Sequence, residues 1–550
     1  MLSSQSNRQR AFTKRSRTGC RTCRVRHVKC DEAPGGCRNC KANGWTCGGY
    51  EQNRLPPRAQ IYASSSSSSS TPSAPLVTGF CWAITTDEKR CVSFFLHHTI
   101  SSLTSYYDSS LWNKLVLQMC CEDSAVFHAV VALSAVNQDL AKQGSSSGAV
   151  AISSWRRYAL EQSMRSFALL SKRRTAHDPQ LRQVVLVCCL LFVILELACG
   201  HFDDATIHLQ SGLAILKEMK VQRKVVGGSG GSVENSLLEA FLQLESQATH
   251  FGAVQPPLYI DHELVHEQRY EAYLYEFRSL QDVWQAFNPL ANTTYPFLEE
   301  CSAKSDAEIA ANYGYFHAKQ QRLLSCLHQF DSHLSQYLQS FYHRLTRKEQ
   351  RGAGIIQLFH RTAVLTVKTC LYARSRPKPA SVVAEYKDLL SKALVIIDKF
   401  PERPFMTVDS SINPTLYAIA ARCPDYAVRL RAIDALRRWP HSEGYLHSTV
   451  IADFVVENMK LGLRELWQKV QSDDSALPPG VLFETRGKGH PIAHISDISG
   501  NYRWILPLDP DPNVAEALLS IRSVRDWTCI RASGMFLPKS TADGQPSSST

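Results

Sequence analysis

The sequence lacks the features that direct a chain into a membrane or a secretory pathway. Met1 to Ala11 are rich in serine, glutamine and arginine and contain no apolar segment of the kind a signal peptide needs. The longest apolar run covers residues 184–195, and Arg182 and Glu196 bracket it closely. At this length a buried core helix is favoured over a bilayer span. We therefore predict a soluble, intracellular protein with no membrane partner.

Motifs of catalysis are also scarce. Neither the G-x-G-x-x-G nor the G-x-x-x-x-G-K-[ST] nucleotide pattern occurs. Residues 262–266, HELVH, match the zinc-peptidase pattern but lack its H-x-x-G-x-x-H continuation. Residues 227–231, GGSGG, fit G-x-S-x-G but lie in a Gly/Ser insertion rather than at a strand-to-helix turn. We predict that the chain is not an enzyme.

Charge is unevenly distributed along the 550 residues. Residues 1–58 hold 13 basic and three acidic side chains, whereas residues 59–550 hold 48 basic and 47 acidic ones. With 44% hydrophobic and 20% charged residues, the composition excludes wholesale disorder, collagen and coiled coil. A short cationic segment joined to a nearly neutral globular part suits a protein whose N-terminus meets a polyanion.

The large C-terminal part shows helical periodicity, without sustained strand alternation or a β-hairpin signal. An all-α domain of stacked antiparallel helices is therefore expected, with insertions at 143–148 and 227–232. Asp203 is the expected N-cap of one of its helices. Two sets of apolar side chains each fall on one helical face: Leu160, Met164, Phe167 and Leu170, and Ala205, Leu209, Leu213 and Leu216.

Composition divides the chain into five segments. The predicted parts are a disordered basic arm at 1–18, a cysteine domain at 19–50, a disordered Ser/Pro-rich linker at 51–80, a helical regulatory domain at 81–533 and a disordered tail at 534–550. The basic arm also has the composition of a nuclear-import signal.

Six of the 18 cysteines follow the spacing C-x2-C-x6-C-x6-C-x2-C-x6-C, which duplicates C-x2-C-x6-C. They are Cys20, Cys23, Cys30, Cys37, Cys40 and Cys47. In a chain without a secretory signal, such a cluster indicates a metal site rather than disulfides. One zinc ion would leave two thiolates unused and two separate tetrahedra would need eight ligands, whereas six suffice for two zinc ions if two thiolates bridge them. We expect the scattered cysteines to be small buried hydrophobes.

The run CRTCRVRHVKCDEAPGGCRNC, completed by Cys47, resembles the DNA-binding domain of fungal zinc binuclear-cluster transcription factors. The resemblance implies two zinc ions per chain, with Cys20 and Cys37 bridging them. Cys23 and Cys30 then complete one tetrahedron, and Cys40 and Cys47 complete the other.

Basic side chains fill the interval between the second and third cysteines, where we predict one short helix that fits the major groove of double-stranded DNA. The resemblance implies that Arg26 and His27 read bases in CGG-like, G·C-rich half-sites, and we assign Arg24 and Lys29 mainly to phosphates. A solvated, non-binding helix face is the alternative for these charges.

The C-terminal part resembles the helical fungal-specific transcription factor domain. The similar stretches begin at Phe94 (FFLHHTISSLTSYYDSSLW), Leu190 (LLFVILELACGHFDDATIHL) and Phe241 (FLQLESQATHFG).

The resemblance implies a nuclear regulator of RNA polymerase II transcription that binds DNA. Its partners are then the transcription machinery or co-regulators, and a secondary-metabolite gene cluster is a target consistent with this family. A zinc-stabilised protein-interaction scaffold without DNA reading is the alternative. Residues 50–90 show no a/d heptad, so monomeric binding and a homodimer formed through the C-terminal part both stay open.

Overall fold

The computed structural model describes the chain in segments. They are residues 19–31, 33, 36–48, 82, 84–143, 153–173, 180–226, 232–250, 277–373, 377–399, 404–472, 477–486, 490–497 and 503–514. The predicted basic arm, linker and C-terminal tail, together with the motifs at 227–231 and 262–266, lie outside these residues. Residues 19–48 are called the cysteine head below, and the described residues between 84 and 514 the helical body.

The cysteine head contains two short helices, α1 (Arg21–Val25) and α2 (Arg38–Ala42), one in each C-x2-C-x6-C repeat. Its buried hydrophobic cluster consists of cysteines, with five of them buried and Cys47 packed against them. Val25 is 74% exposed and Trp45 is 53% exposed, so the apolar side chains lie on the outside.

The helical body confirms the predicted fold class. Its helices up to His250 are α3 (Thr86–Phe94), η3 (Phe95–Thr99), α4 (Ile100–Leu103), η4 (Leu111–Leu115), α5 (Val116–Glu122), α6 (Ser124–Gln143), α7 (Ser154–Arg173), α8 (Leu181–Cys199), α9 (Phe202–Val226) and α10 (Ser232–His250). The later ones are α11 (Leu280–Ala303), α12 (Asp306–Ala311), α13 (Tyr313–Phe341), η7 (Tyr342–Arg344), α14 (Arg347–Thr369), α15 (Ala380–Asp398), α16 (Asn413–Arg422), α17 (Tyr426–Arg438) and α18 (Ser448–Ser472).

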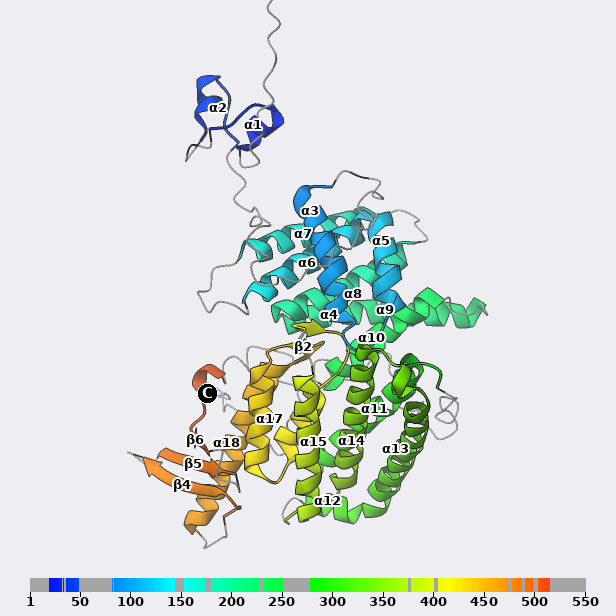
Figure 1. The fold of residues 1–550 in the computed structure, drawn as a ribbon, viewed down its shortest axis with the longest axis vertical. Coiled ribbons are helices and arrows are strands. Elements are labelled where there is room, and N and C mark those ends of the chain that lie inside the picture. Colours follow the sequence, from blue (N-terminus) through cyan, green and yellow to red (C-terminus); the bar gives the residue numbers. More distant parts are fainter. Residues whose placement is uncertain are drawn as a thin grey trace, which may run out of the picture.

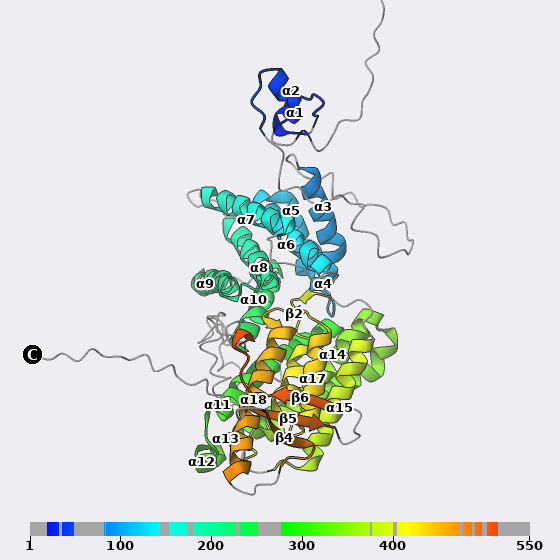
Figure 2. The same ribbon diagram turned by 90° about the vertical axis from the view of Figure 1, so that its left-hand side faces the viewer.

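The body helices form two groups. Figures 1 and 2 show α3 to α9 gathered in one group and α11 to α18 in a second, with α10 between them. One hydrophobic cluster runs from α3 through α10 into α15 to α18, and another is built mainly from α11, α13 and α14. The shared cluster joins the two groups by apolar burial.

Local sequence signals set where several body helices begin. Four helices start with a capping box, in which a Ser or Thr hydroxyl accepts from the N3 backbone and the N3 acid accepts from the cap backbone. The cap residues are Thr85 for α3, Ser279 for α11, Ser305 for α12 and Thr346 for α14. Each box satisfies two backbone N–H groups that the helix cannot pair itself.

Helix α8 contains the long apolar run and lies in the core, as predicted. Twelve of its side chains are buried, from Val184 to Leu197. Among the described residues it is the one helix with the length and composition to cross a membrane. Because its side chains are covered by other helices on most sides, burial within the protein accounts for its composition.

The two predicted helical faces have different outcomes. Ala205, Leu209, Leu213 and Leu216 are all buried along α9. On α7, Leu160 and Met164 are each 63% exposed, and Trp155 and Tyr158 on another face are buried instead. Both stretches are helical, but periodicity alone does not reveal which face meets the core when a helix carries apolar side chains on two sides.

Asp203 also lies two positions further into its helix than predicted. Since α9 begins at Phe202, Asp203 falls in the first turn rather than at the N-cap. Its negative charge still favours the positive end of the helix dipole.

The body contains two small sheets, although the sequence shows no β-hairpin signal. Strands β4 (Val481–Arg486), β5 (His490–Ser496) and β6 (Arg503–Pro507) form an antiparallel sheet beside α17 and α18 (Figure 2). Strands β1 (Met406–Thr407), β2 (Ser442–Glu443) and β3 (Leu446–His447) form a second, very small sheet. Pro491, Ile492 and Ala493 of β5 are all buried, so this strand never shows the period-two alternation that was sought.

Ten of the twelve cysteines outside the head lie in the described body, and none of the described cysteines forms a disulfide. The buried ones are Cys91, Cys120, Cys188, Cys189, Cys301 and Cys423, and the other four are half-buried. They are packed as small apolar side chains, as predicted.

Candidate zinc cluster and nucleic-acid interface

The sulfur atoms of the cysteine head converge at its centre. Cys20 Sγ lies 3.6 Å from Cys37 Sγ and 3.7 Å from Cys40 Sγ. Cys23 Sγ lies at the same two distances from Cys37 and Cys40. Four thiolates around one zinc ion, with Zn–S bonds of about 2.3 Å in a tetrahedron, would sit about 3.8 Å apart.

Two overlapping groups of four sulfurs have the spacing of a shared metal centre. The sulfurs of Cys20, Cys23, Cys30 and Cys37 lie within 4.8 Å of one another, as do those of Cys20, Cys37, Cys40 and Cys47. The two groups have Cys20 and Cys37 in common. Donor type, number and spacing therefore fit two zinc ions joined by two bridging thiolates.

Helix caps orient the two shared cysteines. Cys20 is the N-cap of α1 and its sulfur accepts from Cys23 N at 3.4 Å, while Cys37 caps α2 and accepts from Cys40 N at 3.2 Å. Burial raises the pKa of the Cys20 thiol to about 12. The thiolate form at this position therefore depends on a cation held beside it.

The same backbone pattern repeats 17 residues apart. Cys20 N donates to Cys30 Sγ and Cys37 N donates to Cys47 Sγ, both at 3.3 Å. Each helix then ends in a Schellman turn, in which the backbone of Val28 donates to Cys23 O and that of Trp45 donates to Cys40 O. These turns reverse the chain so that the third cysteine of each repeat returns to the sulfurs.

Side-chain hydrogen bonds hold the two repeats together. Asp31 accepts from Arg38 N at 3.0 Å and from Asn39 N at 3.3 Å at the start of α2. Desolvation would raise the pKa of the Asp31 carboxyl, but these backbone hydrogen bonds lower it below its usual range. Thr22 Oγ1 donates to Thr46 O and accepts from Gly48 N, which joins α1 to the end of the head.

The four basic residues singled out from the sequence do not share one helix, contrary to expectation. Arg24 lies on α1, which ends at Val25, and Arg26 is its C-cap. His27 and Lys29 lie in the turn beyond, and both are exposed, as is Arg24. The helix is short because the chain must turn back at His27 to bring Cys30 to the cluster.

His27 occupies a backbone conformation that favours glycine. Its φ of 56° lies in the left-handed region, and the equivalent residue of the second repeat is Gly44, with φ of 68°. A residue with a Cβ costs roughly 1–2 kcal/mol in this conformation. A strained residue in an exposed turn is a reason to look for a function of its side chain.

Arg26 is held by a residue that sequence reasoning missed. Its guanidinium carbon lies 4.4 Å from the centroid of the Trp45 ring, which belongs to the other repeat. The half-buried Arg26 is therefore oriented by a cation–π contact. Trp45 could have been noticed in the sequence, because it is an aromatic residue two positions before Cys47, where the first repeat has Val28.

Comparisons with known proteins agree with this geometry. Residues 18–56 match the fungal Zn(2)-Cys(6) binuclear cluster domain, which binds two zinc ions. Residues 90–418, more than half of the chain, match the fungal specific transcription factor domain. These families consist of transcription regulators, not enzymes.

Curated relatives share parts of the chain. The aspercryptin biosynthesis cluster-specific transcription regulator atnN of Emericella nidulans is 29% identical over 271 residues, covering 44% of this chain and 41% of that protein. White-opaque regulator 2 of Candida albicans is 47% identical over 53 residues, covering 10% and 12%. Transcription regulator lscL of Purpureocillium lilacinum is 26% identical over 208 residues, covering 36% and 48%.

The matches thus span less than half the length of each of these relatives. No solved structure matches this chain. The two family matches, the sulfur geometry and the helical body together show that the chain belongs to the fungal-specific transcription factor family, with a Zn(2)-Cys(6) cluster at its N-terminal end.

Proposed function

We propose that the chain is a sequence-specific DNA-binding regulator of RNA polymerase II transcription that acts in the nucleus. The observation that carries this function is the pair of four-sulfur groups sharing Cys20 and Cys37, next to an exposed basic turn. A protein scaffold would need the sulfur cluster but would have no use for the basic turn. The helical body then acts as the regulatory part, in contact with transcription machinery or co-regulators.

The six head cysteines are the proposed zinc ligands. Cys20 and Cys37 bridge the two ions, Cys23 and Cys30 complete the first site, and Cys40 and Cys47 complete the second. The separations of the sulfurs support this assignment. Bound zinc stabilises thiolates and folds a segment whose apolar residues are too few to form a core.

DNA contact is assigned to four residues of the first repeat. Arg26 and His27 read base edges in the major groove, while Arg24 and Lys29 neutralise phosphates. Exposure of Arg24, His27 and Lys29 and the fixed orientation of Arg26 over Trp45 support these roles. His27 adopts a strained left-handed conformation, and a base contact of its side chain would explain why a residue other than glycine stands there.

The target is proposed to be a site with CGG-like half-sites in a secondary-metabolite gene cluster. The family resemblance supports the half-site, and the printed name of the relative from Emericella nidulans supports the type of target. Half-site spacing reports the oligomeric state, since a homodimer formed through the body would require two half-sites at a fixed distance.

The test compares equivalent positions of the two repeats in the zinc-loaded full-length protein. Binding is measured on a CGG-containing duplex and on a scrambled duplex of equal base composition, from about 50 to 200 mM salt. Arg24→Ala should weaken binding to both duplexes and reduce the salt slope by about one. Lys41→Ala removes the equivalent exposed charge of the second repeat and serves as the matched control.

Arg26→Ala should instead reduce the preference for CGG, corresponding to about 1–3 kcal/mol, with zinc content unchanged. A wild-type protein that shows no salt slope and no preference between the duplexes would refute DNA reading and support the scaffold alternative. Equal effects of Arg24→Ala and Lys41→Ala would refute the assignment of the interface to the first repeat.

A further inference from the structure

A cavity of about 330 Å³ lies in the second helical group of the body. Side chains of α10, α11, α14, α16 and α18 line it, and no residue of the cysteine head takes part. Small-molecule sites usually measure about 300–1,000 Å³. The volume therefore suits a compact organic molecule.

One wall of the cavity is fixed by a buried acid. The Glu443 carboxylate accepts from the backbone N–H groups of Ser411, Ile412 and Asn413 at 2.6 to 3.1 Å, and it also contacts His441 Nε2 at 2.9 Å. Asn413 is the first residue of α16 and Ser411 and Ile412 come just before it, so the carboxylate pairs N–H groups at the start of the helix that the helix cannot pair itself. The cavity is thus preformed at this end rather than dependent on a mobile loop.

Three buried amide oxygens that line the cavity, those of Gln243, Gln247 and Asn413, have no hydrogen-bond donor among the described residues. Asn413 is fully buried and Gln243 is 9% exposed, and no donor among the described residues reaches Asn413 Oδ1 or Gln243 Oε1. The orientation of Asn413 is set because its Nδ2 must donate to the Leu446 carbonyl, at 2.9 Å. Gln243 Nε2 donates to Ser410 Oγ at 3.3 Å. A buried acceptor left without a donor costs roughly 1–3 kcal/mol, so a ligand with N–H or O–H groups gains by binding here.

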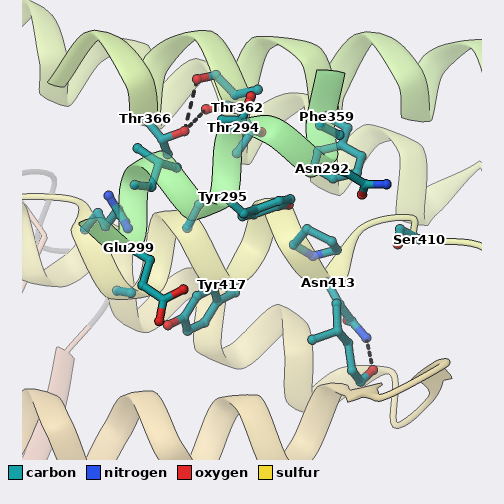
Figure 3. A pocket seen from close by; sticks show the side chains of 18 of the residues that line it. Asn292, Thr294, Tyr295, Glu299, Phe359, Thr362, Thr366, Ser410, Asn413 and Tyr417 are labelled. Atoms are coloured by element: carbon teal, nitrogen blue, oxygen red, sulfur yellow. Dashed lines mark hydrogen bonds between the residues drawn. The ribbon is translucent and has the colours of Figure 1, made fainter. Parts of the chain in front are cut away.

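The middle and far end of the cavity have different chemistry. Figure 3 shows Tyr295 and Tyr417 between Glu299 on one side and Ser410 and Asn413 on the other. Phe359 adds a further aromatic wall. Arg422 and Lys378 also line the cavity, and their N–H groups can donate to a carbonyl group, whereas the Glu299 carboxylate can only accept.

We propose that this cavity binds an uncharged aromatic small molecule that carries amide or hydroxyl donors at one end and a carbonyl at the other. The aromatic part packs against Tyr295, Phe359 and Tyr417. Its donors meet Asn413 Oδ1 and Gln243 Oε1. The proposal goes beyond DNA recognition, because it assigns a ligand site to the body.

N-acetyl-L-phenylalaninamide is a suitable probe, because it is uncharged and aromatic and carries amide N–H and carbonyl groups. Its fully N-methylated analogue keeps the aromatic ring and carbonyls but has no N–H donor. Titration calorimetry on the full-length protein should show binding of the probe, and the methylated analogue should bind at least about tenfold more weakly.

Gln243→Leu removes one unmatched acceptor at similar volume. We expect about tenfold weaker probe binding, with a Tm of the ligand-free protein that is unchanged or raised. Gln285→Leu is the matched control, since Gln285 is exposed on α11 and lies outside the cavity. The Gln285→Leu protein should bind the probe with unchanged affinity. Ala421→Trp should fill the cavity and abolish binding.

Absence of heat and of any Tm shift at millimolar probe would overturn the proposal. Equal affinity of the wild-type protein for the probe and its methylated analogue would also overturn it. This comparison needs no variant, so it tests the proposal even if Gln243→Leu fails to fold. Probe binding that survives Ala421→Trp would place the molecule elsewhere and overturn the assignment to this cavity. A protein that binds the probe but not DNA would keep this inference and refute the proposed function.

Discussion

In the cysteine head the sulfurs form the interior and the large apolar side chains lie outside, whereas in the helical body the large apolar side chains form the interior. Cys20, Cys23 and Cys37 are fully buried while Val25 is 74% exposed; in the body, Phe127 and Leu190 are fully buried. The head therefore draws its folding free energy from metal binding and the body from apolar burial. The two parts should respond to different perturbations.

Zinc removal should have the largest effect, and it should act on the head alone. Chelation, or Cys37→Ala, should unfold the head and abolish DNA binding, because Cys37 belongs to both sulfur groups. The body should keep its far-ultraviolet circular dichroism and its cooperative thermal transition. Cys423→Ala, at a buried body cysteine, is the control and should leave zinc content unchanged. Loss of the body transition on chelation would contradict the independence of the two parts.

Leu190→Ala applies the opposite perturbation. Leu190 is fully buried on α8, so the cavity left behind should lower the free energy of unfolding of the body by about 2–5 kcal/mol. The denaturant midpoint measures this change, and zinc content of the head should stay at two ions per chain. A variant that loses zinc in proportion to its lost stability would show that the head depends on the body.

Acidity should act on the two parts in opposite directions. Desolvation raises the pKa of the Asp409 carboxyl to about 7; Lys348 and the Tyr107 backbone N–H oppose the rise and Glu443 adds to it. Because the folded pKa exceeds the unfolded one, the folded body binds a proton more readily, and its stability should fall as the pH rises from about 4 to 7.

A pKa shift of this size would change the free energy of unfolding of the body by at most about 4 kcal/mol. Asp409→Asn should remove this pH dependence from the thermal unfolding of the body. The head should instead release zinc as the pH falls, since its thiolates become protonated. A body that gains stability between pH 4 and 7 at the same rate with and without Asp409→Asn would contradict the assignment.

A substitution at His27 should change the stability of the head only slightly. His27→Gly should stabilise the zinc-loaded head by about 1 kcal/mol, because glycine adopts φ of 56° without strain, yet it should weaken DNA binding. Gly44→Ala introduces the same strain into the second repeat and should lower stability without changing DNA preference. Chelator competition reports the stability of the head, and duplex binding reports the function. Unchanged DNA affinity of His27→Gly would refute a role for this side chain.

Short-range chemistry explains why much of this could be predicted. The cysteine spacing indicated a two-metal cluster with shared ligands, because ligand number and Zn–S geometry leave few arrangements for six sulfurs. The helical body followed from periodicity, and the buried position of α8 followed from its uninterrupted apolar run.

The features that were missed depend on contacts between distant residues. The Schellman turn that ends α1 before His27 is imposed by the return of Cys30 to the cluster. Leu160 and Met164 lie on the exposed face of α7 because another face, with Trp155 and Tyr158, meets the core. Strand β5 has no clean alternation because its burial is decided by its contact with α17 and α18.

The metal chemistry, the helical class of the body and the location of the positive charge could be predicted without coordinates, since all three depend on residue type and spacing. The stacking of Arg26 on Trp45 and the placement of Gln243 and Asn413 in one cavity could be seen only in the folded chain. These pairs come from different helices or repeats, and the packing of the chain, rather than any local preference, brings them together.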